Sequence, residues 1–555
     1  MKKLENLLKH YWIWILILLV IPSVVSLLHK GFYGASDEVH IAWLYEFHQA
    51  ILAGKIPPRF VPDLSFGFGY PLFNFVFPLP FYLGELFYLA GFSLVYSIKA
   101  VLLLSTILAM FGMFLLLKEF SDYKYALLGS LVYTYAPYRA TNLYVRGAIG
   151  EVVALSLFPF IFLYVYRQLI SKSTNKSNIA LGGIAIGFLV LSHNIASYMF
   201  LPYVAFFVLL FLLFNKGSLK NLPGVFLQAL LGLTISAFFW IPALLESKLV
   251  KYSTVFNYID HFPTLRQLVT PYFGYGASVA GPYDGMSFFV GFAYIATMVI
   301  IFAIVISKWQ WLTNVHKTIA LWLGISLLTT FFMMNHRSSF LWELLPFLKY
   351  FQFPWRFLMV ITFCVPLGVA VLSKQPKSNL LFMTIFTFSL FSIPYFRPQD
   401  FQLRDDNYYL AKYIPKESTI DTYNLQQEEY LRLPVDTQER PGNLYEPFFG
   451  ELPSNASVNR LNSFDATLEL TLTAPTMINY NKYNYPGWHA SNNGNDIGIT
   501  SGSPYGQISV DLPVGEHILS VYYKESGYKL FLDILSLVTF TGLIYIGLQY
   551  KNVKE

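Results

Sequence analysis

Charged side chains are scarce in this sequence. Asp, Glu, Lys and Arg make up 13% of its 555 residues, whereas 55% are hydrophobic. A soluble protein carries about 25% charged residues. The apolar residues gather in many runs of about 15–25 residues, a length that lets a helix cross a bilayer. The composition therefore excludes an ordinary soluble domain and predicts a polytopic α-helical membrane protein.

Cysteine and nucleotide-binding loops are also lacking. The one cysteine, Cys364, lies in an apolar run, so no disulfide can form within the chain. The glycines of "SFGFGYP" (65–71) do not stand between a strand and a helix, so they do not form a nucleotide-binding loop. The net charge of +6 needs no nucleic-acid partner, because lysines beside apolar runs account for much of it.

We expect about twelve membrane spans. Met1 to Val25 lacks a clear cleavage site, so we interpret it as a retained first helix and not as a signal peptide. If the N-terminus is cytoplasmic, each inner connection is short and holds at least two Lys or Arg, as the positive-inside rule requires. Both termini are then cytoplasmic. The predicted spans lie near 11–28, 95–117, 124–139, 152–169, 178–192, 196–214, 221–243, 287–307, 317–334, 355–373, 379–396 and 530–549.

The same alternation sends the acidic loops outward. Loop 29–94 is the longest of them within the membrane domain, 1–396. Its segment 70–92 is apolar enough to span, but prolines interrupt its start and an extra span would break the charge rule. We therefore expect this segment to lie in the outer interface, where aromatic residues favour the headgroup level.

Residues 397–527 differ in pattern from the rest of the chain. "ATLELTLTAP" (466–475) alternates with the period of two that is typical of a half-buried strand. "YGQISVDLPVGEHILSVYYK" (505–524) repeats the alternation around a Pro-Val-Gly turn. We expect an extracytoplasmic, β-sandwich-like domain there, followed by a final span and cytoplasmic tail, 528–555.

Acidic residues collect at the predicted outer face. Asp37, Glu38 and His40 follow the first span directly, and Glu151 begins a later span with Arg146 five residues before it. The simplest interpretation is a solvated loop that ends a helix. Acids at a membrane border are, however, costly to desolvate and are functional candidates.

Such a site suits sugar transfer from a lipid carrier. A sugar linked through phosphate to a polyprenol presents its anomeric carbon at the membrane surface. The acceptor hydroxyl needs a base, which Asp or Glu can supply, and the departing phosphate needs cations, for which Arg is well shaped. A nearby carboxylate also stabilises an oxocarbenium-like transition state.

Other polar residues lie in the same outer loops. Each has an ordinary alternative: a turn between helices, snorkelling to headgroups, or a wet surface. Aromatic residues of "YPGWH" (485–489) could stack on sugars, although the core of a β-domain explains them equally well. The candidates for binding sugar or lipid phosphate are His40, Lys55, Arg59, Arg146, His193, Asn194, Arg337 and Arg356.

A metal site is weakly supported. Asp37, Glu38, His40 and Glu151 could hold a divalent cation through oxygen ligands. No dense cluster of ligands at metal spacing accompanies them. We therefore assign no metal ligands and expect no firmly required cofactor.

Several stretches carry a family resemblance. The first outer loop, "SDEVHIAWLYEFHQAILAGKIPPRFVPDLSFGFGYPLFNFVFPLPFYLG", resembles that of bacterial GT-C-type membrane proteins, and in particular the 6-pyruvoyl-tetrahydropterin-synthase-related group. "YVRGAIGE", "LSHNIAS" and "FQFPWRFL" add to the likeness. "YNYPGWHA" and "VDLPVGEHILSVYY" resemble the outer C-terminal domain of related proteins thought to glycosylate cell-surface polymers.

The resemblance implies a GT-C-like glycosyltransferase of the bacterial plasma membrane. Its donor would be a polyprenyl-phosphate sugar, and its acceptor an extracytoplasmic polymer, lipid or protein. The catalytic base maps to Asp37, with Glu38 as its substitute if the register differs, and the second acid maps to Glu151, where many members of the wider fold have Asp. The alternatives are a transporter or flippase for lipid-linked sugars and a non-catalytic cell-envelope assembly protein.

Overall fold

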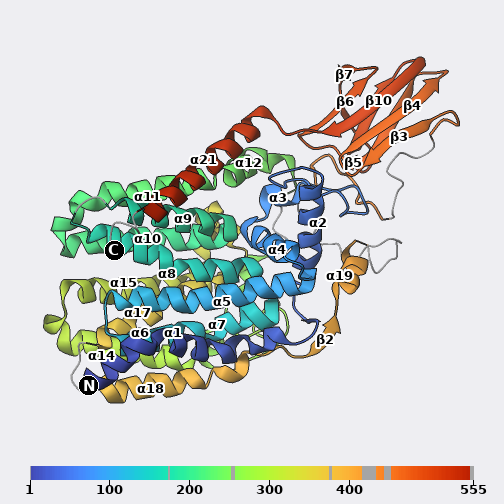
Figure 1. The fold of residues 1–555 in the computed structure, drawn as a ribbon. Coiled ribbons are helices and arrows are strands. Elements are labelled where there is room, and N and C mark those ends of the chain that lie inside the picture. Colours follow the sequence, from blue (N-terminus) through green and yellow to red (C-terminus); the bar gives the residue numbers. More distant parts are fainter. Residues whose placement is uncertain are drawn as a thin grey trace.

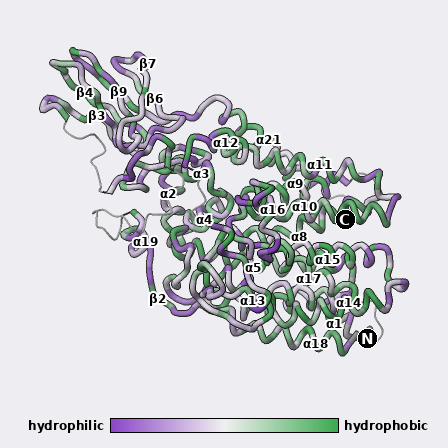
Figure 2. The backbone as a smooth tube through the Cα atoms, turned by 180° about the vertical axis from the view of Figure 1, so that it is seen from behind, coloured by the Kyte–Doolittle hydropathy of each residue, from purple (hydrophilic) through white to green (hydrophobic). Residues whose placement is uncertain are grey.

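The chain forms a helical bundle with a β-sandwich at one end (Figure 1). A computed structural model describes residues 2–172, 175–251, 257–373, 378–414, 433–442 and 452–549. Hydrophobic residues follow the helices of the bundle, whereas hydrophilic residues are concentrated in the sandwich and in the loops at the bundle ends (Figure 2). This division is what a membrane-embedded bundle with an aqueous domain requires.

Each of the twelve predicted spans contains helix. Polar residues begin several of them: Asp122 caps α6, His193 caps α10 and Thr313 caps α15 through side-chain acceptors. The bundle helices are α1 (Lys2–Val24), α5 (Leu94–Lys118), α6 (Tyr123–Thr134), α8 (Ile149–Leu169), α9 (Lys176–Ser192), α10 (Asn194–Phe214), α11 (Leu222–Ile235), α12 (Ala237–Glu246), α14 (Phe292–Lys308), α15 (Asn314–Met333), α17 (Leu358–Leu372), α18 (Ser378–Leu390) and α21 (Gly527–Gln549).

Not every bundle helix can span a membrane alone. In the described ranges, eight helices are long and apolar enough to do so, or nine if the pair α11 and α12, bent by 67°, is counted as one broken span. The helices α6, α9 and α18 are shorter. Pro137 explains the length of α6, because it starts the separate helix α7 (Pro137–Ala140) after a break at Ala136.

The two ends of the bundle carry different loops. The N-terminus and the end of α21 both lie at the end of the bundle opposite the sandwich (Figure 1). Because successive bundle helices alternate in direction, the lysine-rich connections α5–α6, α8–α9, α10–α11 and α14–α15 lie at that same end. The acidic loops lie at the sandwich end, which is the partition that the charge pattern predicts. Which end faces the cytoplasm stays a prediction.

Short helices cover the sandwich end of the bundle. They are α2 (His40–Leu52), α3 (Leu72–Phe75), α4 (Leu79–Leu89), α13 (Leu265–Val269), α16 (Ser339–Leu344) and α19 (Asp406–Tyr413). The predicted interface segment 70–92 forms α3 and α4, of 4 and 11 residues. Neither is long enough to cross a bilayer, so the charge rule was a better guide than hydropathy alone.

One strand and one helix, together called the strap below, hold the first outer loop in place. Strand β2 (Phe401–Arg404) pairs antiparallel with β1 (Phe32–Tyr33). Asp406, at the start of α19, accepts hydrogen bonds from the backbone N–H groups of Leu94 and Val95 at 2.8 and 2.9 Å. It thereby caps the otherwise unpaired amides at the start of α5.

The C-terminal strands form a β-sandwich, as predicted. One sheet has the order β3-β4-β10-β6-β7 and the other β5-β9-β8. Inward-facing residues of both sheets, such as Leu468, Val510 and Val521, share one core, which is how two sheets pack face to face. The strands are β3 (Ser457–Asn462), β4 (Asp465–Leu472), β5 (Thr476–Tyr483), β6 (Trp488–Asn492), β7 (Asn495–Ile497), β8 (Thr500–Gly502), β9 (Gln507–Leu512) and β10 (Gly515–Tyr523).

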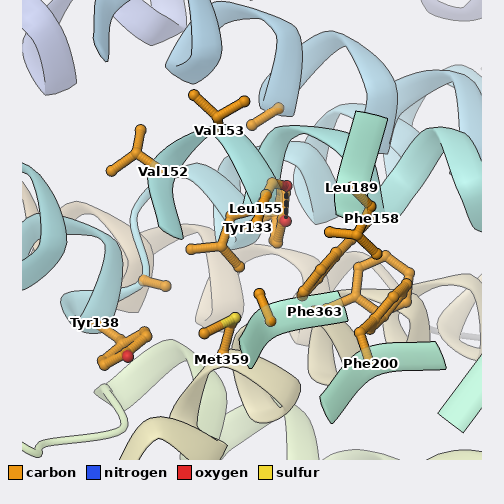
Figure 3. Packing of buried hydrophobic residues seen from close by; sticks show 14 of the residues in the cluster. Tyr133, Tyr138, Val152, Val153, Leu155, Phe158, Leu189, Phe200, Met359 and Phe363 are labelled. Atoms are coloured by element: carbon orange, nitrogen blue, oxygen red, sulfur yellow. Dashed lines mark hydrogen bonds between the residues drawn. The ribbon is translucent and has the colours of Figure 1, made fainter. Parts of the chain in front are cut away.

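Aromatic rings fill the centre of the bundle (Figure 3). The rings of Phe158 and Phe200 stack with centroids 3.7 Å apart, and Phe363 meets Phe200 edge-on at 5.0 Å. The hydroxyl of Tyr133 donates to the carbonyl of Leu155. This packing joins α6, α8, α10 and α17 and holds the start of α8, where Glu151 lies.

Cysteine labelling tests the predicted orientation. Cys364 is fully buried, so the unaltered chain should not react with a membrane-impermeant maleimide. Val514 and Lys220 are exposed at opposite ends of the molecule. We expect Val514→Cys to be labelled in intact bacterial cells and Lys220→Cys only after permeabilisation. The reverse pattern would invert the topology.

Candidate functional site

A buried carboxylate with two ion-pair partners and one hydrogen-bond donor lies at the sandwich end of the bundle. Glu151 stands in the first turn of α8 and is 0% exposed. Its Oε1 lies 2.8 Å from Nη1 of Arg146 and 3.3 Å from Nε of Arg356. Its Oε2 accepts a hydrogen bond of 2.8 Å from the hydroxyl of Tyr138. A buried charge is tolerated only with such pairing.

Local backbone geometry brings Arg146 to Glu151. Residues Thr141–Arg146 form a π-helical turn, and Gly147 follows in the left-handed conformation at φ +66°. This residue type turns the chain so that α8 can begin immediately afterwards. Gly150 is equally constrained, because a Cβ there would come within 2.5 Å of the ring of Phe77 and 2.9 Å of His193.

Asp37 is docked beside this ion pair. Its backbone N–H donates to the carbonyl of Arg146 at 2.8 Å, and its Oδ2 lies 3.8 Å from Nη2 of the same arginine. The side chain is 33% exposed, whereas Glu151 is fully enclosed. Asp37 is therefore the carboxylate of this cluster that a substrate can reach.

Arg356 is held from the opposite side. Its Nη1 donates to the carbonyl of Phe351 at 3.0 Å and to Oε1 of Gln352 at 2.6 Å. Gln352 adopts φ +63°, an unusual conformation for a residue other than glycine. Trp355 lies against both arginines, with the guanidinium of Arg146 5.1 Å and that of Arg356 5.9 Å from its ring, within cation–π range.

Two histidines border the cluster. The Nδ1 of His193 accepts a hydrogen bond of 3.0 Å from the backbone N–H of Ala196. Burial lowers the pKa of His193 to about 3, so its ring is neutral at neutral pH and carries its proton on Nε2. His40 begins α2 and packs against Phe77, which also lies against the ring of His193 at 5.1 Å. Both predicted histidines thus lie next to the acidic centre.

Glu38 belongs to a different set of contacts. Its carboxylate is paired with Lys412 and with Nη1 of Arg404 at 3.2 Å. Tyr413 adds a hydrogen bond at 3.4 Å. These partners come from β2 and α19, so Glu38 fastens the strap to the first outer loop, and its geometry gives no support to its role as a substitute base.

Lys55 and Arg59 join the outer loop to the sandwich and to α21. Lys55 Nζ donates to the carbonyl of Tyr523 at 2.7 Å. Arg59 is 3% exposed, and its Nη2 lies 2.5 Å from Asp533 and 3.0 Å from the carbonyl of Phe238. These contacts occupy both cations, which favours a structural role over the predicted grip on phosphate.

Asn194 and Arg337 are exposed, and neither is among the recorded partners of the cluster in the described part of the chain. Asn194 is exposed, and its side chain accepts from the backbone N–H of Ile195 at 3.2 Å. Arg337 is exposed in the short helix His336–Ser338, and no ion pair is recorded for it within the described ranges. Of the predicted residues, the structure gathers Asp37, Arg146, Glu151, Arg356 and the two histidines.

Sequence reasoning missed two members of the site. Tyr138 binds Glu151, and Trp355 covers the arginines while its indole N–H donates to Ser278 at 3.2 Å. Both are aromatic in a chain whose aromatic content is 18%, so neither stood out. A metal centre gains no support, since the residues described by the structure contain no group of three or more His, Cys, Asp or Glu placed to bind one.

Comparison with known families identifies the class of the chain. A family model described as "6-pyruvoyl-tetrahydropterin synthase related domain; membrane protein" matches residues 73–396. This range is more than half of the 555 residues. The chain therefore belongs to this family of membrane proteins, as its loop sequences predict.

Individual relatives are distant. An uncharacterized protein from Lactococcus lactis subsp. cremoris (strain MG1363) is 28% identical over 254 residues, which are 43% of this chain and 41% of that protein. The match thus spans less than half of the relative's length.

Three solved structures are similar in part. Arabinofuranosyltransferase AftD from Mycobacteria has a TM-score of 0.42 at 14% identity, over 67% of this chain and 26% of that one. ArnT from Cupriavidus metallidurans, bound to undecaprenyl phosphate, has 0.42 at 13% over 66% and 61%. The Archaeoglobus fulgidus oligosaccharyltransferase has 0.46 at 14% over 80% and 62%. With TM-scores below 0.5, none of these likenesses carries an inference about this chain.

Stability measurements can distinguish the buried, structural role of the Glu151 carboxylate from the partly exposed position of the Asp37 carboxylate. Glu151→Gln leaves two buried guanidinium groups with too little negative charge, so we expect a loss of about 3–5 kcal/mol in the free energy of unfolding. Asp37→Asn removes a partly exposed contact and should cost about 1 kcal/mol or less. Thermal unfolding of the purified full chain in detergent measures both. Equal stability of Glu151→Gln and the unaltered chain would contradict the buried-pair interpretation.

Proposed function

We propose that this protein is a membrane glycosyltransferase of the bacterial plasma membrane. It transfers a sugar from a polyprenyl-phosphate donor to a hydroxyl of an extracytoplasmic polymer, lipid or protein. Membership of a membrane-protein family and the relative in a bacterium support the setting. The support for the chemistry comes from the site.

The observation that carries the proposal is the placement of Asp37. Its backbone is bonded to Arg146, its carboxylate lies 3.8 Å from that guanidinium, and one third of the side chain is open to substrate. A general base has to be fixed in place and within reach of the proton that it removes. Glu151 is enclosed by its donors and instead holds the two arginines in position.

The charges of the cluster suit the transfer step. The acceptor oxygen bonds to the anomeric carbon, the bond from that carbon to the phosphate oxygen breaks, and the acceptor proton passes to Asp37. The lipid phosphate gains one negative charge as it departs. In the resting cluster two arginines face two carboxylates, so protonation of Asp37 leaves one positive charge in excess. The excess positive charge is present at the step in which the phosphate gains negative charge, so it stabilises the departing phosphate.

Transport of lipid-linked sugars is the second candidate. A transport path needs polar groups along the middle of the spans. From α5 onward, the Asp, Glu, Lys and Arg residues of the candidate spans lie within about two turns of a helix end. Lys99, Glu151, Arg167 and Asp533 are examples. This distribution leaves the middle of the described spans without charged residues, which favours chemistry at a membrane surface over a transport path. An assembly protein, the third candidate, would not need a fixed and accessible carboxylate.

Sugar transfer by the purified full chain tests the proposal. The donors are undecaprenyl-phosphate glucose and other undecaprenyl-phosphate hexoses, labelled in the sugar, and each is offered with hydroxyl-bearing acceptors, namely diglucosyl diacylglycerol and soluble hexasaccharides. Transfer of the label to the acceptor, with release of undecaprenyl phosphate, is the readout. We expect Asp37→Asn to slow release by at least about a hundredfold, the usual contribution of a general base, and Asp37→Glu to keep part of the activity.

The matched control is Asp511→Asn, an identical substitution at an exposed position of the sandwich, which should behave like the unaltered chain. Reactions in detergent micelles, which have no two sides, exclude transport as the source of product. Full activity of Asp37→Asn, or no release from any donor, would refute the proposal.

A further inference from the structure

Gln352 has a backbone conformation that residues other than glycine rarely adopt. Its φ of +63° and ψ of −48° place it at the centre of a γ-turn, in which the N–H of Phe353 donates to the carbonyl of Phe351 at 2.7 Å. A γ-turn with positive φ is rare and strained. Such strain persists only where the surrounding contacts enforce it, and it often marks a functional position.

The turn brings two acceptors to Arg356. The Nη1 atom of this arginine donates to the carbonyl of Phe351 at 3.0 Å and to Oε1 of Gln352 at 2.6 Å. The short helix Pro354–Phe357 follows the turn and carries Arg356 back toward it. Gln352 is half-buried, and Arg356 is 6% exposed. The strained turn therefore holds one guanidinium group in a fixed place.

The acceptors that the turn supplies carry no net charge. Glu151 is the one carboxylate paired with Arg356 among the described residues, at 3.3 Å, and it lies closer to Arg146, at 2.8 Å. Arg146 has a second carboxylate, that of Asp37, at 3.8 Å. Arg59, a structural cation, is likewise paired with two carboxylates. Arg356 is thus the least neutralised of these three arginines.

We propose that Gln352 is a positioning residue for the transfer step. Its amide oxygen fixes Arg356 without cancelling the charge of the arginine, so that this charge remains available to the departing lipid phosphate. A charge acts over several ångströms where water is scarce, so the buried guanidinium does not have to touch the phosphate. The inference rests on the proposed function, because it gives Gln352 a part in that reaction.

Gln352→Glu distinguishes this role from a purely structural one. The new carboxylate can accept the same hydrogen bond from Arg356 and stays ionised beside the guanidinium. It would hold the arginine at least as firmly as the amide does. It would also remove the excess positive charge that protonation of Asp37 leaves in the cluster. Either side chain satisfies a structural role, but only the neutral one satisfies the proposed role.

The transfer assay on the full chain measures the effect. Thermal unfolding of Gln352→Glu should show no loss of stability. Its kcat should fall at least about tenfold, whereas KM for the donor should change less. The reason is that the intact donor phosphate carries one negative charge and the departing phosphate carries two. Loss of positive charge therefore acts more strongly on the transition state than on donor binding.

Gln352→Gly tests the hydrogen bond by itself. Glycine adopts positive φ without strain, so the turn should still form and only the side-chain acceptor is lost. Arg356 then keeps the Phe351 carbonyl and Glu151 but has one partner fewer. We expect unchanged thermal stability and a kcat that is lower by roughly five- to tenfold.

Gln438→Glu is the matched control. Gln438 is exposed beside the sandwich, and its Oε1 accepts a hydrogen bond of 3.2 Å from the hydroxyl of Ser503. The identical substitution keeps an accepted hydrogen bond and adds the same charge, but it does so outside the cluster. This variant should have the kcat and KM of the unaltered chain.

The outcomes separate the positioning role from the proposed function. Transfer by the unaltered chain, with a kcat for Gln352→Glu within about twofold of it, would overturn the role of Gln352 and leave the transfer proposal standing. Loss of both stability and transfer in Gln352→Glu would also overturn it, because the residue would then serve folding alone. No transfer by the unaltered chain would refute the proposed function and this role together.

Discussion

The structure of this end of the molecule depends on one buried ion-pair cluster. In it, Glu151 neutralises two arginines at a place that water does not reach. The carboxylate is fully buried, and its charge is acceptable only because it forms ion pairs with Arg146 and Arg356 and accepts a hydrogen bond from Tyr138. These partners come from α7, the following π-helical turn and the segment before α17. Their convergence therefore ties three separate parts of the chain to the start of α8, and Asp37 gains a fixed charged neighbour.

Two consecutive acids at this surface have different partners. Asp37 turns toward Arg146, whereas Glu38 turns away to Lys412 and Arg404. The second pair anchors the strap formed by β2 and α19, which also caps α5 through Asp406. The loop is thus bonded on both sides of the exposed carboxylate, so its position does not depend on a flexible turn. A carboxylate held in this way would lose little entropy on meeting a substrate if it serves as the proposed base.

The sequence predicted the helices better than it predicted their lengths. Long apolar runs and the lysines between them are local signals, so the twelve helical segments and their two-ended loop pattern follow directly from them. The end of α6 at Thr134 depends on the break before Pro137, and the bend of 67° between α11 and α12 has no comparable local signal. Tyr138 and Trp355 escaped notice for a related reason, since one aromatic residue among many carries no pattern of its own.

Residue type and spacing by themselves determined that this chain enters a membrane, which loops share an end, and that acids and arginines gather where the spans emerge. Only the tertiary structure decided the roles within that group. Arg59 meets Asp533 across 474 residues of sequence, and Glu38 meets Lys412 across 374, so both become structural pairs. Asp37 alone of its cluster's carboxylates keeps an open face. Burial and long-range pairing depend on how distant segments fold together, and a linear pattern contains no measure of either.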